Sequence, residues 1–142
     1  KLKENEKKFG LLSKKTYQDF ARRVNELKRK TVDFIRSEAA KGKKVYVANI
    51  MTKWGETNGF SAAEFIRAIE SHLGKKILNY VIVNTKQPTL NRMLHYEKEF
   101  SEFVHAGNLA ANPVPVFGDF LRKRGFVRHD PIKLASVLVS LL

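Results

Sequence analysis

The chain has 142 residues, of which 43% are hydrophobic. This length suits one substantial core and is too short for two ordinary domains. The absence of cysteine excludes disulfides and thiolate chemistry and leaves metal binding to His, Asp and Glu. No apolar run approaches the roughly 20 residues that span a bilayer. No secretory signal is visible either, so we expect a cytoplasmic protein without a membrane partner.

The formal net charge is +13, and +9 of it lies in residues 1–44. Within that region the sequence predicts one long amphipathic helix over 14–41, with Ser13 as its N-cap and Gly42 just beyond its end. We expect its apolar stripe to pack on a sheet and its Lys and Arg side chains to stay in water. A polyanion-binding face is the alternative. Interleaved Asp and Glu side chains weaken it, so nucleic acid is not the expected partner.

Residues 45–61 predict a buried strand, a glycine loop and the start of a helix. Val45–Ile50 carries no charge, as expected of a strand that is covered on both faces. Ser61 and Glu64 form a capping box at the helix start. In parallel sheets, ligands bind outside the carboxyl ends of the strands. The pattern therefore favours a nucleotide or phosphorylated ligand, held by the loop residues Thr52, Gly55, Glu56, Thr57, Asn58 and Gly59. As an alternative, Thr57 and Asn58 are ordinary turn residues.

The rest of the chain continues this alternation. We expect a helix over 61–73 that stops at Gly74, a strand over 77–83, a helix from Pro88 to about residue 100, and a short strand at 103–104. Residues 106–116 predict an irregular loop, and Pro131 begins a last helix with Asp130 as its N-cap. The fold class is therefore α/β: a three-layer, Rossmann-like single domain over 1–142, with helices on both faces of a mostly parallel sheet of about four strands.

Several motifs resemble one family. Asn49-Ile50-Met51-Thr52 followed by Gly55-Glu56-Thr57-Asn58-Gly59-Phe60-Ser61, and later Arg128-His129-Asp130, are similar to the 2-phospho-L-lactate transferase (CofD) and gluconeogenesis-factor family. The resemblance covers about residues 45–142. The chain departs from the family pattern at Lys53, Trp54 and Asn58. It also lacks the Gly-Gly-Gly-Thr-Gly loop with which family members begin, so catalysis by this chain alone is not expected and its status as an enzyme stays open.

The resemblance implies that Tyr96 and Arg128 hold a nucleotide of the UDP-sugar type, and His129 could act as acid, base or donor. From the pattern alone, Tyr96 is a core or edge aromatic, and Asp130 caps a helix while Arg128 pairs with it. The remaining histidines show no metal-ligand spacing, so no metal is expected. The sequence identifies no cofactor with certainty, and a nucleotide or nucleotide sugar would fit. Whether the chain forms a homo-oligomer is left open.

A fainter resemblance links residues 12–47 to the C-terminal domain of sugar C-methyltransferases. Three functions follow from the sequence. The favoured one is a CofD-like nucleotide or phospho-metabolite binding fragment of a phosphotransferase-like or metabolic regulatory protein. The second is a composite or engineered Rossmann-like scaffold without activity, and the third is a basic RNA-binding module.

Overall fold

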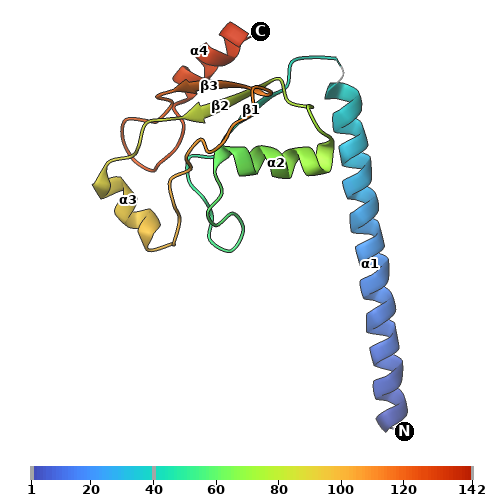
Figure 1. Cartoon of the computed structure of the whole chain (residues 1–142). Coiled ribbons are helices and arrows are strands. Elements are labelled where there is room, and N and C mark those ends of the chain that lie inside the picture. The colour runs from blue at the N-terminus through green and yellow to red at the C-terminus, as the bar shows by residue number, and fades with distance from the viewer. Residues whose placement is uncertain (1, 40, 142) are drawn as a thin grey trace. The chain divides into compact units, whose positions relative to one another are not determined.

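The computed structural model describes residues 2–39 and 41–141, without the side chains of residues 2–14, 35, 36, 38 and 39. The chain divides into two compact units, Lys1–Lys41 and Gly42–Leu142. The positions of the two units relative to one another are not determined (Figure 1). The prediction that both belong to one domain therefore stays a prediction.

The first unit is a single helix, α1 (Leu2–Ala39). It begins well before residue 14, so the predicted N-cap Ser13 lies inside the helix. The apolar stripe is exposed along its described part, where Tyr17, Phe20, Leu27 and Phe34 each leave 64–72% of their surface open. The packing of this stripe on the sheet stays a prediction.

The second unit is built on a parallel sheet of three strands, β1 (Val45–Val47), β2 (Tyr80–Asn84) and β3 (Val114–Gly118). Their order is β1-β2-β3, with Val45 opposite Tyr80 and Tyr80 opposite Val114. Sequence order and spatial order therefore agree, and all three strands end at one edge (Figure 1). The predicted α/β class with a parallel sheet is confirmed, with three strands in the described residues rather than about four.

Helices cover both faces of this sheet. In Figure 1, α2 (Ala62–Leu73) lies below it and α4 (Pro131–Leu141) above it. The larger core cluster joins Phe65 and Ile66 of α2 to Val81 and Val83 of β2. Ile82 points the other way because strand side chains alternate between faces, and it is completely buried. Burial on both faces therefore explains why β2 carries no charged residue.

The predicted helix ends of the second unit are accurate where capping chemistry is strong. Ser61 and Glu64 form the expected capping box, and Gly74 ends α2 at a φ of 110°. Asp130 Oδ1 accepts hydrogen bonds from the amides of Ile132 (3.0 Å) and Lys133 (3.2 Å), which confirms it as the cap of α4. α3 (Leu90–Glu97) is shorter than predicted and starts after Thr89, with Pro88 outside the helix.

Two strand predictions need correction. Residues 114–118 form β3, although prolines placed residues 114–116 in the predicted loop. Pro115 is tolerated because β3 pairs on one side only, with β2, so a missing N–H can face outward. Phe103, predicted in a short strand, makes a single antiparallel bridge with Met51. Among the described residues, no helix has both the length and the apolar run that crossing a membrane demands.

Candidate functional site

The carboxyl ends of the three parallel strands, here called the strand exits, lie at one edge of the sheet. Asn84, at the end of β2, ties the exits together. Its Oδ1 accepts a hydrogen bond from the amide of Phe120 (3.0 Å), and its Nδ2 donates to the carbonyl of Lys86 (2.7 Å). Asn84 is 4% exposed, so these bonds satisfy a polar side chain that burial would otherwise destabilise. The segments after β2 and β3 are therefore held side by side.

The glycine loop after β1 is shaped by bonds within itself. The amide of Lys53 donates to Thr57 Oγ1 (2.8 Å), and the amide of Gly55 donates to Asn58 Oδ1 (2.7 Å). Lys53 Nζ also pairs with Glu56. Three predicted ligand residues, Glu56, Thr57 and Asn58, thus form a hydrogen-bonded turn, and their role toward a ligand stays a prediction.

The glycines of this loop are required by backbone conformation. Gly55 and Gly59 have φ values of 79° and 67°, which L side chains rarely adopt. A Cβ at either position would meet nothing within 4 Å, so no close neighbour explains the choice of glycine. Thr52 is 5% exposed, and its hydroxyl accepts the amide of Glu102 (2.8 Å).

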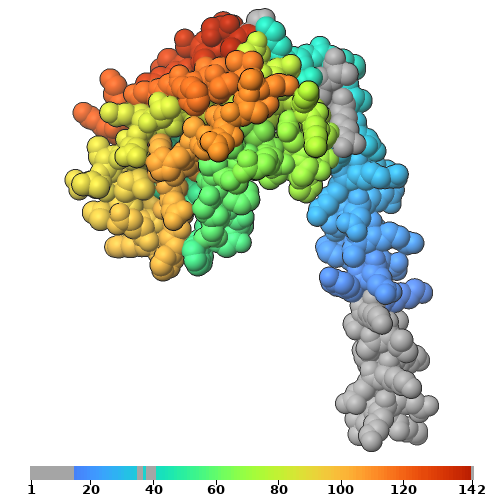
Figure 2. Space-filling view, viewed as in Figure 1, coloured from blue at the N-terminus to red at the C-terminus, as the bar shows by residue number. Residues whose placement is uncertain are grey.

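The loop packs beside the segment that follows α3. Trp54 lies against Phe100 with ring centroids 5.2 Å apart, and Met51 bridges Phe103. Figure 2 shows the green loop next to the orange segment. Trp54 remains 62% exposed, so this aromatic pair forms an open surface beside the strand exits.

Tyr96 and the Arg128 segment are brought together although 31 positions separate Tyr96 from Val127. The Val127 amide donates to the Tyr96 hydroxyl at 3.0 Å. The guanidinium of Arg128 lies 5.9 Å from the ring centroid of Phe126, and that ring lies 5.8 Å from His95. Arg128 is exposed and free to turn toward an anion, whereas Tyr96 Oη is already used as an acceptor. Ile50, Leu121 and Val127 form the apolar floor under this group.

His129 is partly enclosed beside Arg128. Its Nε2 is buried and has no hydrogen-bond partner within the described residues. Burial lowers the pKa of the imidazole below 6.5, because desolvation disfavours the charged form. His129 is therefore neutral at pH 7, the state in which one ring nitrogen can donate a hydrogen bond and the other can accept one.

This burial predicts a pH dependence of stability. Between the lowered folded pKa and 6.5, the unfolded chain binds a proton that the folded chain does not, so the free energy of unfolding should fall as the pH drops through 6.5. Urea titrations from pH 7.5 to 5.5 should show a smaller fall for His129→Gln than for the unsubstituted chain. The exposed His105→Gln variant serves as control. Equal slopes for the unsubstituted chain and both variants would contradict the predicted contribution of His129.

A hollow of about 150 Å³ lies at the same edge, between the exits of β2 and β3 and the start of α3. Its lining includes the cations Lys86, Arg122 and Lys123 and the N-cap Thr89. Asp119 also lines it, but its carboxylate pairs with Lys133 at 3.0 Å. This hydrogen bond from Lys133 holds the pKa of Asp119 below its usual value, so the carboxylate stays ionised and Lys133 balances its charge. The local charge therefore favours an anion.

Arg92 of α3 anchors the loop that carries Arg122 and Lys123. Its guanidinium donates to three backbone carbonyls, those of Arg122 (2.8 Å), Gly125 (2.9 Å) and Phe126 (2.8 Å). A planar fork of donors suits several fixed acceptors at once. Arg92 is thus a structural residue that positions Arg122 and Lys123.

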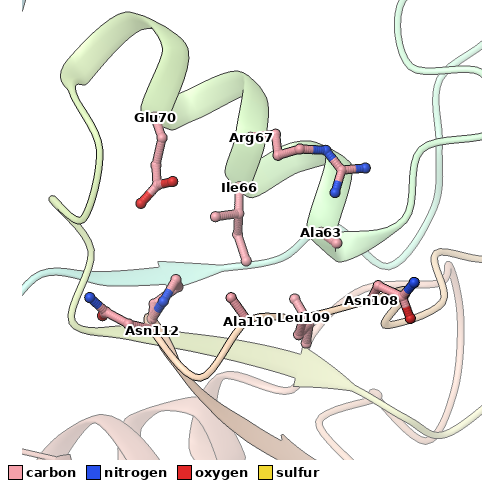
Figure 3. A pocket seen from close by; sticks show the side chains of 9 residues that line it. Ala63, Ile66, Arg67, Glu70, Asn108, Leu109, Ala110 and Asn112 are labelled. Carbon is pink, nitrogen blue, oxygen red and sulfur yellow. The ribbon is translucent and has the colours of Figure 1, made fainter.

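A second hollow, of about 220 Å³, lies elsewhere. Ala63, Ile66, Arg67 and Glu70 of α2 face the segment before β3 across it (Figure 3). Arg67 already pairs with Glu64, and the floor mixes the apolar Leu109 and Ala110 with Asn108 and Asn112. None of the predicted ligand residues lines either hollow. The second hollow is separate from the strand exits because the segment that lines it precedes β3. Within the part of the chain that the structure describes, no three His, Asp or Glu residues gather as a metal site would require.

Comparison with known proteins identifies the family of this chain. Residues 30–117 match the family described as 2-phospho-L-lactate transferase CofD. The chain belongs to the CofD family. It is 34% identical over 107 residues to the gluconeogenesis factor of Listeria monocytogenes and 35% identical over 107 residues to that of Bacillus subtilis. These alignments cover 73% and 72% of this chain.

A solved structure also matches this chain. A crystal structure of a UPF0052 family protein from Bacillus halodurans is similar with a TM-score of 0.65 and 26% identity, over 70% of this chain and 33% of that one. The chain likewise spans 33% and 34% of the two gluconeogenesis factors. It thus corresponds to about a third of these CofD-family relatives.

A second match covers the N-terminal region. Residues 1–53 match the C-methyltransferase C-terminal domain, which overlaps the CofD match over residues 30–53. Both resemblances noted in the sequence are therefore present, and their overlap runs from the end of α1 through β1.

Sequence reasoning did not select Lys86, Arg92, Arg122 and Lys123 as site residues. The basic run Arg122-Lys123-Arg124, six residues or fewer before Arg128, was a usable signal. The position of this run beside the strand exits depends on Asn84 and Arg92, which hold the segments after β2 and β3 together. The bonds from Asn84 to Phe120 and from Arg92 to Phe126 join positions 36 and 34 residues apart and leave no local pattern.

Proposed function

We propose that this CofD-family segment binds a nucleotide or phosphorylated metabolite of the UDP-sugar type at the carboxyl edge of its sheet. The observation that carries the proposal is the cationic hollow formed by Lys86, Arg122 and Lys123 outside the ends of β2 and β3. Lys and Arg donors bind phosphate oxygens strongly, and Arg can do so with two parallel hydrogen bonds.

The neighbouring residues suit the rest of such a ligand. Leu121 lines the hollow and also packs in the cluster that contains Tyr96, so the two features are contiguous. In this proposal, phosphate groups occupy the cationic hollow, and Arg128 with the exposed ring of Phe126 contacts the base or sugar. Neutral His129 supplies a hydrogen bond next to Arg128.

Ligand-induced stabilisation tests the proposal. UDP-glucose or GDP at about 100 times its Kd should raise the melting temperature of the second unit by roughly 10–20 °C, since only the folded chain binds it. Arg128→Ala and Lys123→Ala should each weaken binding at least about tenfold, because each removes a charge-assisted hydrogen bond. Lys75→Ala, an exposed cation beyond Gly74, should leave the shift unchanged. Equal losses in all three variants, or no shift with either nucleotide, would overturn the proposal.

The composite scaffold remains the competing function, and a specific observation favours it. The two family matches cover different parts of the chain and overlap only at residues 30–53. A scaffold of this kind would fold and melt cooperatively, yet show no stabilisation by either nucleotide. The same titration therefore separates the two functions.

A further inference from the structure

The exposed face of α1 carries a regular apolar pattern. Along its described side chains, apolar or weakly polar residues recur at alternating spacings of three and four, namely Tyr17, Phe20, Val24, Leu27, Thr31 and Phe34. This spacing repeats every seven residues and forms a seam along one side of a helix. The seam is about 27 Å long at 1.5 Å per residue. It has the pattern of a surface that packs against another helix.

Within the described part of the first unit, nothing covers the seam. Phe20, Leu27 and Phe34 expose 65%, 64% and 66% of their surfaces. Contiguous exposed aromatic and aliphatic side chains are uncommon on proteins that have no partner at that surface. A partner is therefore indicated by both the spacing and the exposure.

Charge next to the seam identifies the chemistry of that partner. At 100° per residue, Arg23 and Lys30 lie along one side of the seam and Lys28 along the other. The acidic residues of this stretch, Asp19, Glu26 and Asp33, lie farther round the helix. Two of them make exposed ion pairs, Asp19 with Arg22 at 3.2 Å and Glu26 with Lys30 at 2.9 Å. Exposed pairs contribute little, so Lys30 can exchange its partner.

A second copy of α1 is a poor occupant of this seam. In a parallel pair, Arg23 of one helix would face Lys28 of the other, and in an antiparallel pair Lys28 would face its own equivalent. Like charges beside the seam oppose both arrangements, whereas Glu and Asp at those positions would favour them. RNA fits less well, because the seam itself is apolar and acidic side chains interrupt the basic face.

We propose that α1 docks an amphipathic helix of a partner protein in which Glu or Asp residues flank an apolar stripe. The partner's apolar side chains pack between Phe20, Leu27 and Phe34, and its acids pair with Arg23, Lys28 and Lys30. This mode of recognition lays one amphipathic helix along another. It is independent of nucleotide binding by the second unit.

Two synthetic peptides test this docking on the full 142-residue chain. Both are fluorescein-labelled 21-residue helices with leucine at the seam positions, and one has Glu beside the seam where the other has Lys. Fluorescence anisotropy should show the Glu peptide binding at least tenfold more tightly than the Lys peptide. Arg23→Glu combined with Lys28→Glu should reverse this preference. Equal affinities would overturn the proposal.

Substitutions in the seam provide the second arm. Leu27→Asp should weaken binding of the Glu peptide at least tenfold, and Leu27→Ala, which keeps high helix propensity, should also weaken it. Arg29→Ala, on the outer face, is the matched control and should not change the affinity. Circular dichroism at 222 nm monitors the helix in each variant.

Three results would assign the seam to another occupant and overturn the proposal. One is a dimer of the chain alone in sedimentation velocity that Leu27→Asp dissociates. Another is a Leu27→Asp variant whose second unit melts several degrees lower while the Glu peptide fails to bind, which would indicate packing on the chain's own sheet. The third is oligouridylate binding that exceeds Glu-peptide binding and survives Leu27→Asp.

Discussion

Replacing Phe65 by alanine should lower the free energy of unfolding of the second unit by about 3–5 kcal/mol, the usual cost of removing a buried aromatic ring. Phe65 is 8% exposed and packs with Val81 and Val83. Its ring also lies edge-on to Phe60 at a centroid distance of 5.3 Å. The substitution would remove both the packing of α2 on β2 and this aromatic contact.

Urea denaturation followed by far-ultraviolet circular dichroism measures this loss. The matched control is Phe117→Ala in β3, because that ring is 53% exposed and should cost about 1 kcal/mol or less. Domains of this size are stable by roughly 5–15 kcal/mol, so the Phe65 variant could approach unfolding at 37 °C. Similar losses at both positions would show that α2 does not form the main core contact.

Replacing Arg92 by alanine should release the loop over residues 122–126. The three carbonyls that Arg92 binds are accessible to water, which compensates part of the loss, so we expect local opening to increase by about tenfold. Trypsin cleaves after Lys and Arg, and this loop contains Arg122, Lys123 and Arg124. The initial rate of cleavage there should therefore rise about tenfold, with a smaller rise for Arg92→Lys, which retains one donor group.

Arg67→Ala is the matched control for this experiment. Arg67 pairs with Glu64 on α2 and lines the other hollow, which contains no residue of the basic loop, so its loss should not change cleavage at residues 122–124. Nucleotide affinity provides a separate measure. If the proposed site is real, Arg92→Ala should weaken binding together with faster cleavage. Faster cleavage with unchanged affinity would separate the loop from the ligand site.

The structure also explains why some sequence predictions were accurate and others were not. The start of α2 follows from Ser61 and Glu64, which bond to each other's backbone across three residues. The cap of α4 by Asp130 is equally local. β3 depends on its neighbour: Pro115 predicts a loop when considered alone, and forms a strand because β2 pairs with it along five residues.

The candidate site also has a part that was visible in the sequence and parts that were not. The glycine loop was visible in the sequence because Gly55 and Gly59 take positive φ values that their own residue type permits. The pairing of Tyr96 with Val127 and the anchoring of residues 122–126 by Arg92 were not visible, because each joins segments about 30 residues apart.

By itself, the sequence determined the alternation of strands and helices, the caps of α2 and α4, the basic character of the N-terminal region and the resemblance to the CofD family. These depend on residue type, on spacing within one or two turns, and on motifs that stay contiguous in the chain. The tertiary structure decided which cations share a hollow, which predicted ligand residues are already bonded to their own loop, and which nitrogen of His129 is buried without a partner. These properties arise from long-range packing, since burial and charge proximity exist only once the strand exits have been brought to one edge.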